Sequence, residues 1–128
     1  MLDFFRSRLR SLRYAFSGWW HVIRTQRNAW IHAVVSLLVL AVCTWLRLPA
    51  RDWALIILAI AMVWTAEFVN TALEAVVDLA ANHQRHNLAR VSKDVGAAAV
   101  LIAALASILV GLLVIGPPLW VKLSMMHW

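Results

Sequence analysis

The sequence is poor in the residues that stabilise or mark a soluble domain. Only 14% of its 128 residues are charged, against about 25% in soluble domains, which excludes an ordinary charged surface facing water on all sides. The one cysteine, Cys43, excludes an intrachain disulfide. The four glycines lie at positions 18, 96, 111 and 116, and they form neither a Walker loop nor a glycine-rich dinucleotide fingerprint. The chain therefore lacks both common nucleotide-binding motifs.

Apolar residues make up 63% of the chain, and the eight tryptophans are of a type enriched at membrane interfaces. Apolar segments of roughly membrane-spanning length cover about residues 30–46, 53–73 and 95–115. A turn at 47–52 and a polar loop at 79–94 separate them, and the Gly-Pro-Pro sequence at 116–118 is expected to end the third helix. The pattern predicts an all-α integral membrane protein, one domain over residues 1–128 with three transmembrane helices.

The segment before the first span, residues 1–28, carries six arginines and is too long and basic for a signal peptide. On a helix, its large apolar side chains, from Phe4 to Ile23, cover an arc of about 160°, and most of the basic residues lie at the edge of that arc or beyond it. This arrangement is typical of an amphipathic helix lying in the membrane interface, with its arginines toward lipid phosphates. A simple membrane anchor is the other interpretation.

Basic residues are distributed unequally between the two sides of the expected membrane. Segments 1–28 and 79–94 carry six and three Lys or Arg, whereas the 47–52 turn carries two and the tail one. The positive-inside rule therefore predicts a multi-pass protein of the inner or plasma membrane, with its N-terminus and the 79–94 loop in the cytoplasm. Because most of these charges flank apolar spans, the net charge of +6 favours anionic lipid over nucleic acid as a partner.

A polar stripe interrupts the second apolar helix, within the sequence EFVNTALEAVVD of residues 67–78. At about 100° per residue, its polar side chains share one face. At 1.5 Å per residue, Glu67 lies about 21 Å and Glu74 about 31 Å along the helix from Trp53. In a hydrocarbon core about 30 Å thick, the first lies within the inner half and the second at the cytoplasmic boundary. Polar residues at such depth indicate function; they are Glu67, Asn70, Glu74 and Asp78.

The chemistry of this stripe suits a reaction between a water-soluble reagent and a membrane-dissolved one. A poorly hydrated carboxylate such as Glu67 suits a general base, and Glu74, nearer water, suits a hard cation such as Mg²⁺. The 79–94 loop adds the cations Arg85, Arg90 and Lys93, which could neutralise phosphate oxygens. From the residues alone, a proton or ion pathway, or polar contacts between helices of an oligomer, explain the same stripe.

Four motifs together closely resemble the small prokaryotic diacylglycerol kinase family, which includes undecaprenol kinases. They are EFVNTALEAVVD at 67–78, KDVGAAAVLIA at 93–103, RYAFSG at 13–18 and RTQRNAWIH at 24–32. The resemblance implies a homotrimeric membrane enzyme. It further implies transfer of the γ-phosphate of ATP, with Mg²⁺, to the hydroxyl of a lipid alcohol, diacylglycerol or undecaprenol, at the cytoplasmic face.

The resemblance also implies roles for particular residues. Glu67 matches the catalytic base, Glu74 a metal ligand, and Asn70 a neighbour that positions the base or the substrate. The basic N-terminal helix contributes Arg10 and Arg13 to substrate binding or positioning. The residues expected to contact the nucleotide are Tyr14, Gln84, Arg85, His86, Lys93 and Asp94.

One position departs from the family pattern. A glutamate that acts as the second metal ligand commonly precedes the Arg-Asn pair, and here that position is Gln26. An amide oxygen can ligate Mg²⁺ but contributes no charge. We therefore expect either a more weakly held metal or a site in which an amide replaces the carboxylate.

Overall fold

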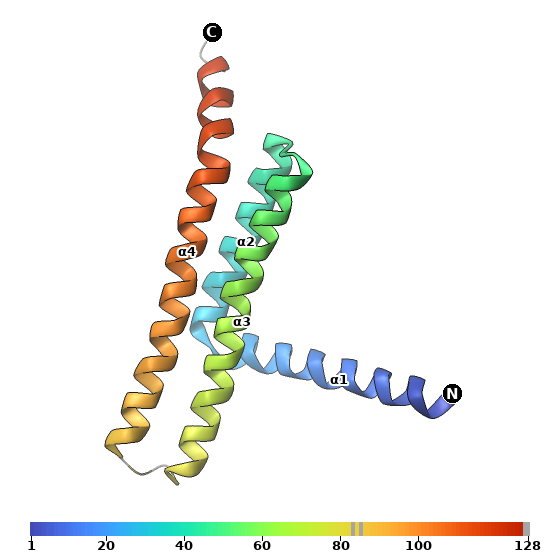
Figure 1. Cartoon of the computed structure of the whole chain (residues 1–128), viewed down its shortest axis with the longest axis vertical. Helices are drawn as coiled ribbons and strands as arrows, with labels where there is room; N and C mark the ends of the chain where they lie inside the picture. Colours follow the sequence, from blue (N-terminus) through green and yellow to red (C-terminus); the bar gives the residue numbers. More distant parts are fainter. Residues whose placement is uncertain (83, 85, 127–128) are drawn as a thin grey trace.

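The computed structural model describes residues 1–82, 84 and 86–126, without the side chains of residues 2 and 3. The described part consists of helices joined by short turns, and three of the helices are long and apolar enough to cross a membrane. This confirms the predicted all-helical class with three candidate spans. Figure 1 shows the four helices in chain order, α1 (Leu2–Thr25), α2 (Arg27–Leu46), α3 (Ala50–Ala80) and α4 (Asn87–Met125).

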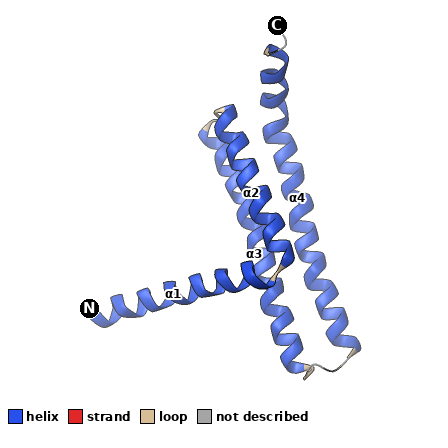
Figure 2. Ribbon diagram, turned by 180° about the vertical axis from the view of Figure 1, so that it is seen from behind, coloured by secondary structure: helices blue, strands red, loops and turns tan. Residues whose placement is uncertain are grey.

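Helices α2, α3 and α4 run side by side, and α1 projects away from them (Figures 1 and 2). Helix α3 makes most of its contacts with α4, and Ser107 of α4 donates a hydrogen bond to the carbonyl of Ala59 at 2.9 Å. The C-terminal half of α3 and the first turns of α4 continue past the level at which α1 leaves the bundle. Polar residues late in α3 therefore lie at or beyond the level of α1.

The corner between α1 and α2 is a single residue, Gln26, with extended backbone angles of φ −101° and ψ 118°. Its amide still donates to the carbonyl of Val22 at 2.9 Å, which completes the last turn of α1. Val22 and Ala29, on either side of the corner, are buried against Trp64 of α3. Trp19 stacks on the same Trp64 ring, with centroids 4.7 Å apart. Apolar contacts thus fix the position of Gln26 against α3.

The connection between α3 and α4 is shorter than the loop predicted over residues 79–94. Helix α3 continues to Ala80 and α4 begins at Asn87, so Arg90, Lys93 and Asp94 lie on a helix and the prediction of a loop there is wrong. The Nδ1 atom of His86 accepts a hydrogen bond from the backbone amide of Leu88 at 3.2 Å. Capping of this kind satisfies an amide at a helix start, which explains why the polar composition of this segment does not prevent a helix.

The predicted end of the last helix at residues 116–118 is also wrong. Pro117 and Pro118 lie inside α4, which continues to Met125. Each proline removes one backbone hydrogen bond. In an apolar environment, however, a chain that leaves the helix exposes many more unsatisfied backbone groups than the two prolines do. Apolar residues on both sides of the pair therefore keep the helix intact.

Candidate functional site

One cleft of about 290 Å³ collects the polar residues of α3 together with the α1–α2 corner and the start of α2. Three of the four residues of the predicted stripe line it, and so does Gln26; Asp78, the fourth, does not. The opposite wall, from α4, is apolar and built of small and medium side chains. The lining residues are Gln26, Asn28, Ile31, His32, Glu67, Asn70, Glu74, Ala97, Val100, Leu101 and Ala104.

Glu67 is the most deeply buried charged residue in the described chain, with 1% of its surface exposed. Among the described residues, its Oε2 atom has no hydrogen-bond partner. The nearest basic group is His32 of α2, whose Nε2 atom lies 3.9 Å from Oε2. A buried polar atom without a partner is rare and costs free energy. This carboxylate is therefore a candidate for binding a group from outside the chain.

Asn70 and Glu74, one and two turns further along α3, form a connected pair. The Nδ2 atom of Asn70 donates to Oε1 of Glu74 at 3.0 Å. The Oδ1 atom of Asn70 is buried and has no partner among the described residues. Gly96 of α4 makes this arrangement possible, because a Cβ atom there would collide with Asn70 Oδ1. Close approach of the two helices thus fixes the direction of the Asn70 amide.

The cleft residues fit a hard divalent cation. Mg²⁺ prefers oxygen ligands, and it is usually bound by one or two carboxylates together with waters and substrate phosphates. The cleft offers the carboxylate of Glu74 and the amide of Gln26, and Asn70 donates to that carboxylate through its Nδ2 atom. In the part of the chain that the structure describes, no three His, Cys, Asp or Glu side chains form a metal-binding group. The donor set therefore suits a cation that is held jointly with phosphate.

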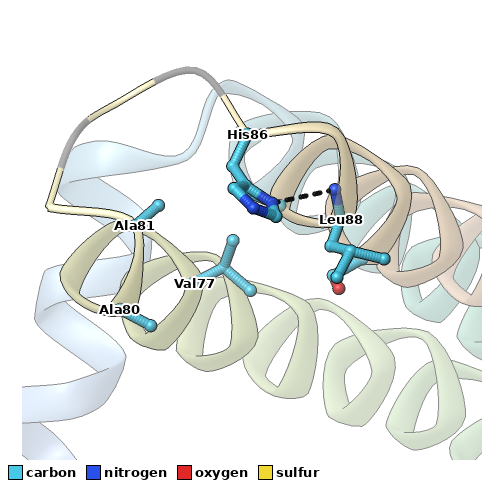
Figure 3. Close-up of a pocket in the computed structure, with 7 residues that line it drawn as sticks. Val77, Ala80, Ala81, His86 and Leu88 are labelled. Atoms are coloured by element: carbon cyan, nitrogen blue, oxygen red, sulfur yellow. Dashed lines mark hydrogen bonds between the residues drawn. The ribbon is translucent and has the colours of Figure 1, made fainter.

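A second cavity, of about 280 Å³, lies where α3 meets the start of α4 (Figure 3). Of the residues predicted to contact the nucleotide, His86 lines this cavity, and Figure 3 shows its ring beside Val77 and the Leu88 amide. Nearby, Lys93 forms an ion pair with Asp78 of α3, with 2.6 Å between Nζ and Oδ1. The residues that line the second cavity are Val77, Ala80, Ala81, His86, Leu88, Ala89 and Ser92.

The other predicted nucleotide and substrate residues that the structure describes line neither cavity. Gln84 and Asp94 are exposed, and Arg85 lies outside the described residues. The three residues predicted on the N-terminal helix are exposed on the part of α1 that projects from the bundle (Figure 2). Within one chain they line neither the cleft nor the second cavity; they are Arg10, Arg13 and Tyr14.

Two cleft residues, Asn28 and His32, were missed by the analysis of the sequence. Both lie on α2, four residues apart, and residues at this spacing share a helix face. His32 also stands within an apolar helix, where an ionisable side chain is itself a signal of function. These two features could have identified them, but only contact with α3 shows that His32 faces Glu67 and that Asn28 lines the same cleft.

Comparison with known proteins places the chain in a family. Residues 13–115 match the family model described as prokaryotic diacylglycerol kinase. The chain is 42% identical over 111 residues to a diacylglycerol kinase of Synechocystis, an alignment that covers 87% of this chain and 63% of that protein. It is 36% identical over 110 residues to the undecaprenol kinase of Bacillus subtilis, covering 86% of this chain and 89% of that protein.

A third relative, the diacylglycerol kinase of Escherichia coli strain K12, is 36% identical over 90 residues, covering 65% of this chain and 73% of that protein. The chain therefore belongs to the prokaryotic diacylglycerol kinase family. This confirms the family predicted from the four motifs, and with it a place among the lipid kinases. The matched range contains the whole cleft, from Gln26 to Ala104.

Proposed function

We propose that the chain transfers the γ-phosphate of ATP to the hydroxyl of a lipid alcohol, diacylglycerol or undecaprenol, at the cytoplasmic face of the plasma membrane. The observation that carries the proposal is Glu67, a buried carboxylate with an unpartnered oxygen. It faces a cleft that also contains the oxygen donors Asn70 and Glu74. In a chain of a lipid kinase family, this arrangement suits a base beside a phosphate-binding region.

In this reaction Glu67 is the general base. The hydroxyl of the lipid alcohol enters the cleft and donates its hydrogen bond to Oε2. As the hydroxyl oxygen forms a bond to the γ-phosphorus, the bond from that phosphorus to the bridging oxygen of ADP breaks, and the hydroxyl proton passes to Oε2. Catalysis of such a transfer depends mostly on positioning and on stabilisation of charge on the phosphoryl oxygens. Burial of Glu67 fixes the position of the base, and this contributes to the positioning.

The charge on the phosphate oxygens requires cationic partners. We propose that Glu74 and Gln26 would hold Mg²⁺, which would neutralise phosphate charge when bound, and that Asn70 positions the base or the substrate. For the nucleotide we propose the predicted set around the start of α4, with His86 and Lys93 nearest the second cavity. Lys93 can exchange its carboxylate partner for phosphate at small cost, because its side chain and that of Asp78 are 38% and 43% exposed and exposed ion pairs contribute little.

The N-terminal helix is proposed to lie in the cytoplasmic membrane interface, with the N-terminus and the α3–α4 connection in the cytoplasm. Trp19 of α1 contacts both Trp64 and Phe68 of α3, the residues on either side of Glu67. An interfacial α1 would therefore put Glu67 at the boundary between lipid and water. That is the depth at which a lipid hydroxyl and a water-soluble phosphate donor meet.

We further propose a homotrimer, as the resemblance to the family implies. Large apolar side chains are exposed along α2 and α4 of the single chain. Arg10, Arg13 and Tyr14 reach neither cavity of their own chain. Both features support association, since neighbouring chains would cover part of the apolar surface and could bring these residues to a site.

The function is tested with purified protein, labelled ATP and a panel of lipid alcohols that includes diacylglycerol and undecaprenol. Wild-type protein is expected to phosphorylate at least one alcohol. Glu67→Gln is expected to lower the rate by about 10²–10⁴-fold, the usual contribution of a general base, with ATP affinity unchanged in a nucleotide titration. The control is Asp52→Asn, which also replaces a carboxylate by an amide but lies in the first turn of α3. A folded wild-type protein that phosphorylates no alcohol would contradict the proposal.

A further inference from the structure

His32 is an ionisable cleft residue whose chemistry the proposed reaction leaves unused. Its Nε2 atom is buried and, among the described residues, has no hydrogen-bond partner. The same is true of Oε2 of Glu67, which it faces at 3.9 Å. Both residues line the cleft, and these two atoms lie side by side at its wall, so one partner from outside the chain would satisfy both.

The distance between these atoms decides what that partner can be. At 3.9 Å they are too far apart for a direct hydrogen bond, which requires about 2.7–3.2 Å. One oxygen atom placed about 2.8 Å from both would bridge them with an angle of about 90° at that oxygen. A hydroxyl fits this position, because it donates one hydrogen bond and accepts another. A carbonyl or phosphate oxygen, which only accepts, would leave the Glu67 carboxylate without a donor.

The surrounding contacts hold the imidazole in this position. His32 packs edge-on against Trp64, with ring centroids 6.3 Å apart and an interplanar angle of 65°. The Nε1 atom of Trp64 donates to Oγ of Ser36 at 3.3 Å, one turn beyond His32 on α2. The contact of Trp64 with His32 and Ser36 therefore holds α2 against α3, and this fixes His32 of α2 beside Glu67 of α3.

We infer that His32 is a second substrate-binding group of the reaction, and that its Nε2–H donates a hydrogen bond to the hydroxyl oxygen of the lipid alcohol. This inference rests on the proposed function. The hydroxyl then directs its proton at Oε2 of Glu67, and its remaining lone pair is free to attack phosphorus. Ala97, Val100 and Leu101 form an apolar wall to the same cleft, which suits the lipid portion of this substrate and not a water molecule alone.

The test compares two replacements of His32 that differ in the ability to donate. His32→Gln keeps an amide donor at similar reach, whereas His32→Leu fills the space without one. For the purified variants in lipid bilayers, four quantities are measured: kcat and KM for the lipid, KM for ATP, and the lipid-independent hydrolysis of ATP. His21→Leu, on the exposed surface of α1, is the matched control, and the combined fluorescence of the eight tryptophans follows the overall fold.

We expect His32→Leu to lower kcat for the lipid by about 10–100-fold, the usual cost of a misaligned reactant. His32→Gln should stay within a few-fold of wild type, and the ATP parameters should not change in either variant. Wild-type kcat in His32→Leu, or equal loss in both variants with a parallel loss of ATP hydrolysis, would overturn the inference. If leucine unfolds the protein, His32→Met provides the variant without a donor. A wild-type protein inactive on every lipid alcohol would instead overturn the proposed function.

Discussion

At the residue scale, the cleft depends on one position that has no side chain. Gly96 lies on α4 directly against Asn70, and a Cβ atom at this position would meet both Asn70 Oδ1 and a methyl group of Leu73. The conformational freedom of glycine is not needed here, because Gly96 is within a regular helix. What matters is the close approach of the two helices, which turns the amide of Asn70 toward Glu74.

Gly96→Ala is therefore expected to displace Asn70 and break its hydrogen bond to Glu74. Overpacking of this kind costs about 1–3 kcal/mol, and loss of a hydrogen bond to a charged group costs about as much. We expect the Mg²⁺ concentration at half-maximal activity to rise about tenfold, measured by titration of the lipid kinase rate. Gly111→Ala, on the same helix with open space around the new methyl group, should leave the midpoint unchanged. Equal midpoints in the two variants would contradict this account of Gly96.

At the element scale, the helices differ in how they are held. Helix α4 has 39 residues, about 58 Å at 1.5 Å per residue, so it extends well beyond a hydrocarbon core about 30 Å thick. Near its C-terminus, Lys122 donates to the carbonyl of Trp45 at 2.5 Å and lies 4.3 Å from the centre of that ring. Helix α1, in contrast, packs on the bundle near its C-terminal end, through Trp19, Val22 and Ile23.

Trp19→Ala is expected to loosen α1 without unfolding α2, α3 and α4. Loss of its contacts with Trp64 and Phe68 should cost about 1–2 kcal/mol, which raises the population of the detached helix about tenfold. If α1 detaches and returns faster than trypsin cuts, the cleavage rate is proportional to the detached population. Limited trypsin digestion at Arg24 and Arg27 should then accelerate by the same factor. The control is Phe16→Ala, because this ring on α1 is 73% exposed. Identical digestion of both variants would show that the Trp19 stack does not hold α1.

At the scale of the whole molecule, the single chain leaves much of its apolar surface uncovered. Leu37 on α2 and Leu113 on α4, for example, are 68% and 77% exposed. Soluble monomers rarely expose large contiguous apolar patches, so lipid or neighbouring chains must cover these helices. Three apolar helices that bury little against one another are also weakly stabilised as a monomer, which favours association in the membrane.

The proposed homotrimer predicts a particle of three 14.4 kDa chains in mild detergent, measured as the protein mass by native mass spectrometry. Activity and trimer are expected to disappear together when the detergent is made harsher, because Arg10, Arg13 and Tyr14 line neither cavity of a single chain. Full activity in a preparation that contains only single chains would contradict the proposal. Activity that follows the trimer fraction across several detergents would support it.

Much of the fold could be predicted from sequence because the signals are local. Apolar segments of spanning length identify the three long helices, and the spacing from Glu67 to Glu74 puts both carboxylates on one helix face. The helix ends were less predictable. Local composition suggests a loop over residues 79–94 and a stop at Pro117, but the His86 cap and the apolar surroundings of the prolines decide otherwise.

The family and the polar stripe follow from the sequence alone, because each depends on residue type and spacing within a segment. The candidate roles of Glu67, Asn70 and Glu74 are what the family resemblance implies. Only the tertiary structure decided which other residues meet them. Gln26 lies at the α1–α2 corner and His32 lies on α2. Packing of Val22 and Ala29 against Trp64 of α3 puts both residues at the cleft. Contacts between helices distant in sequence leave no periodic pattern, so a single chain read in order cannot reveal that His32 faces Glu67.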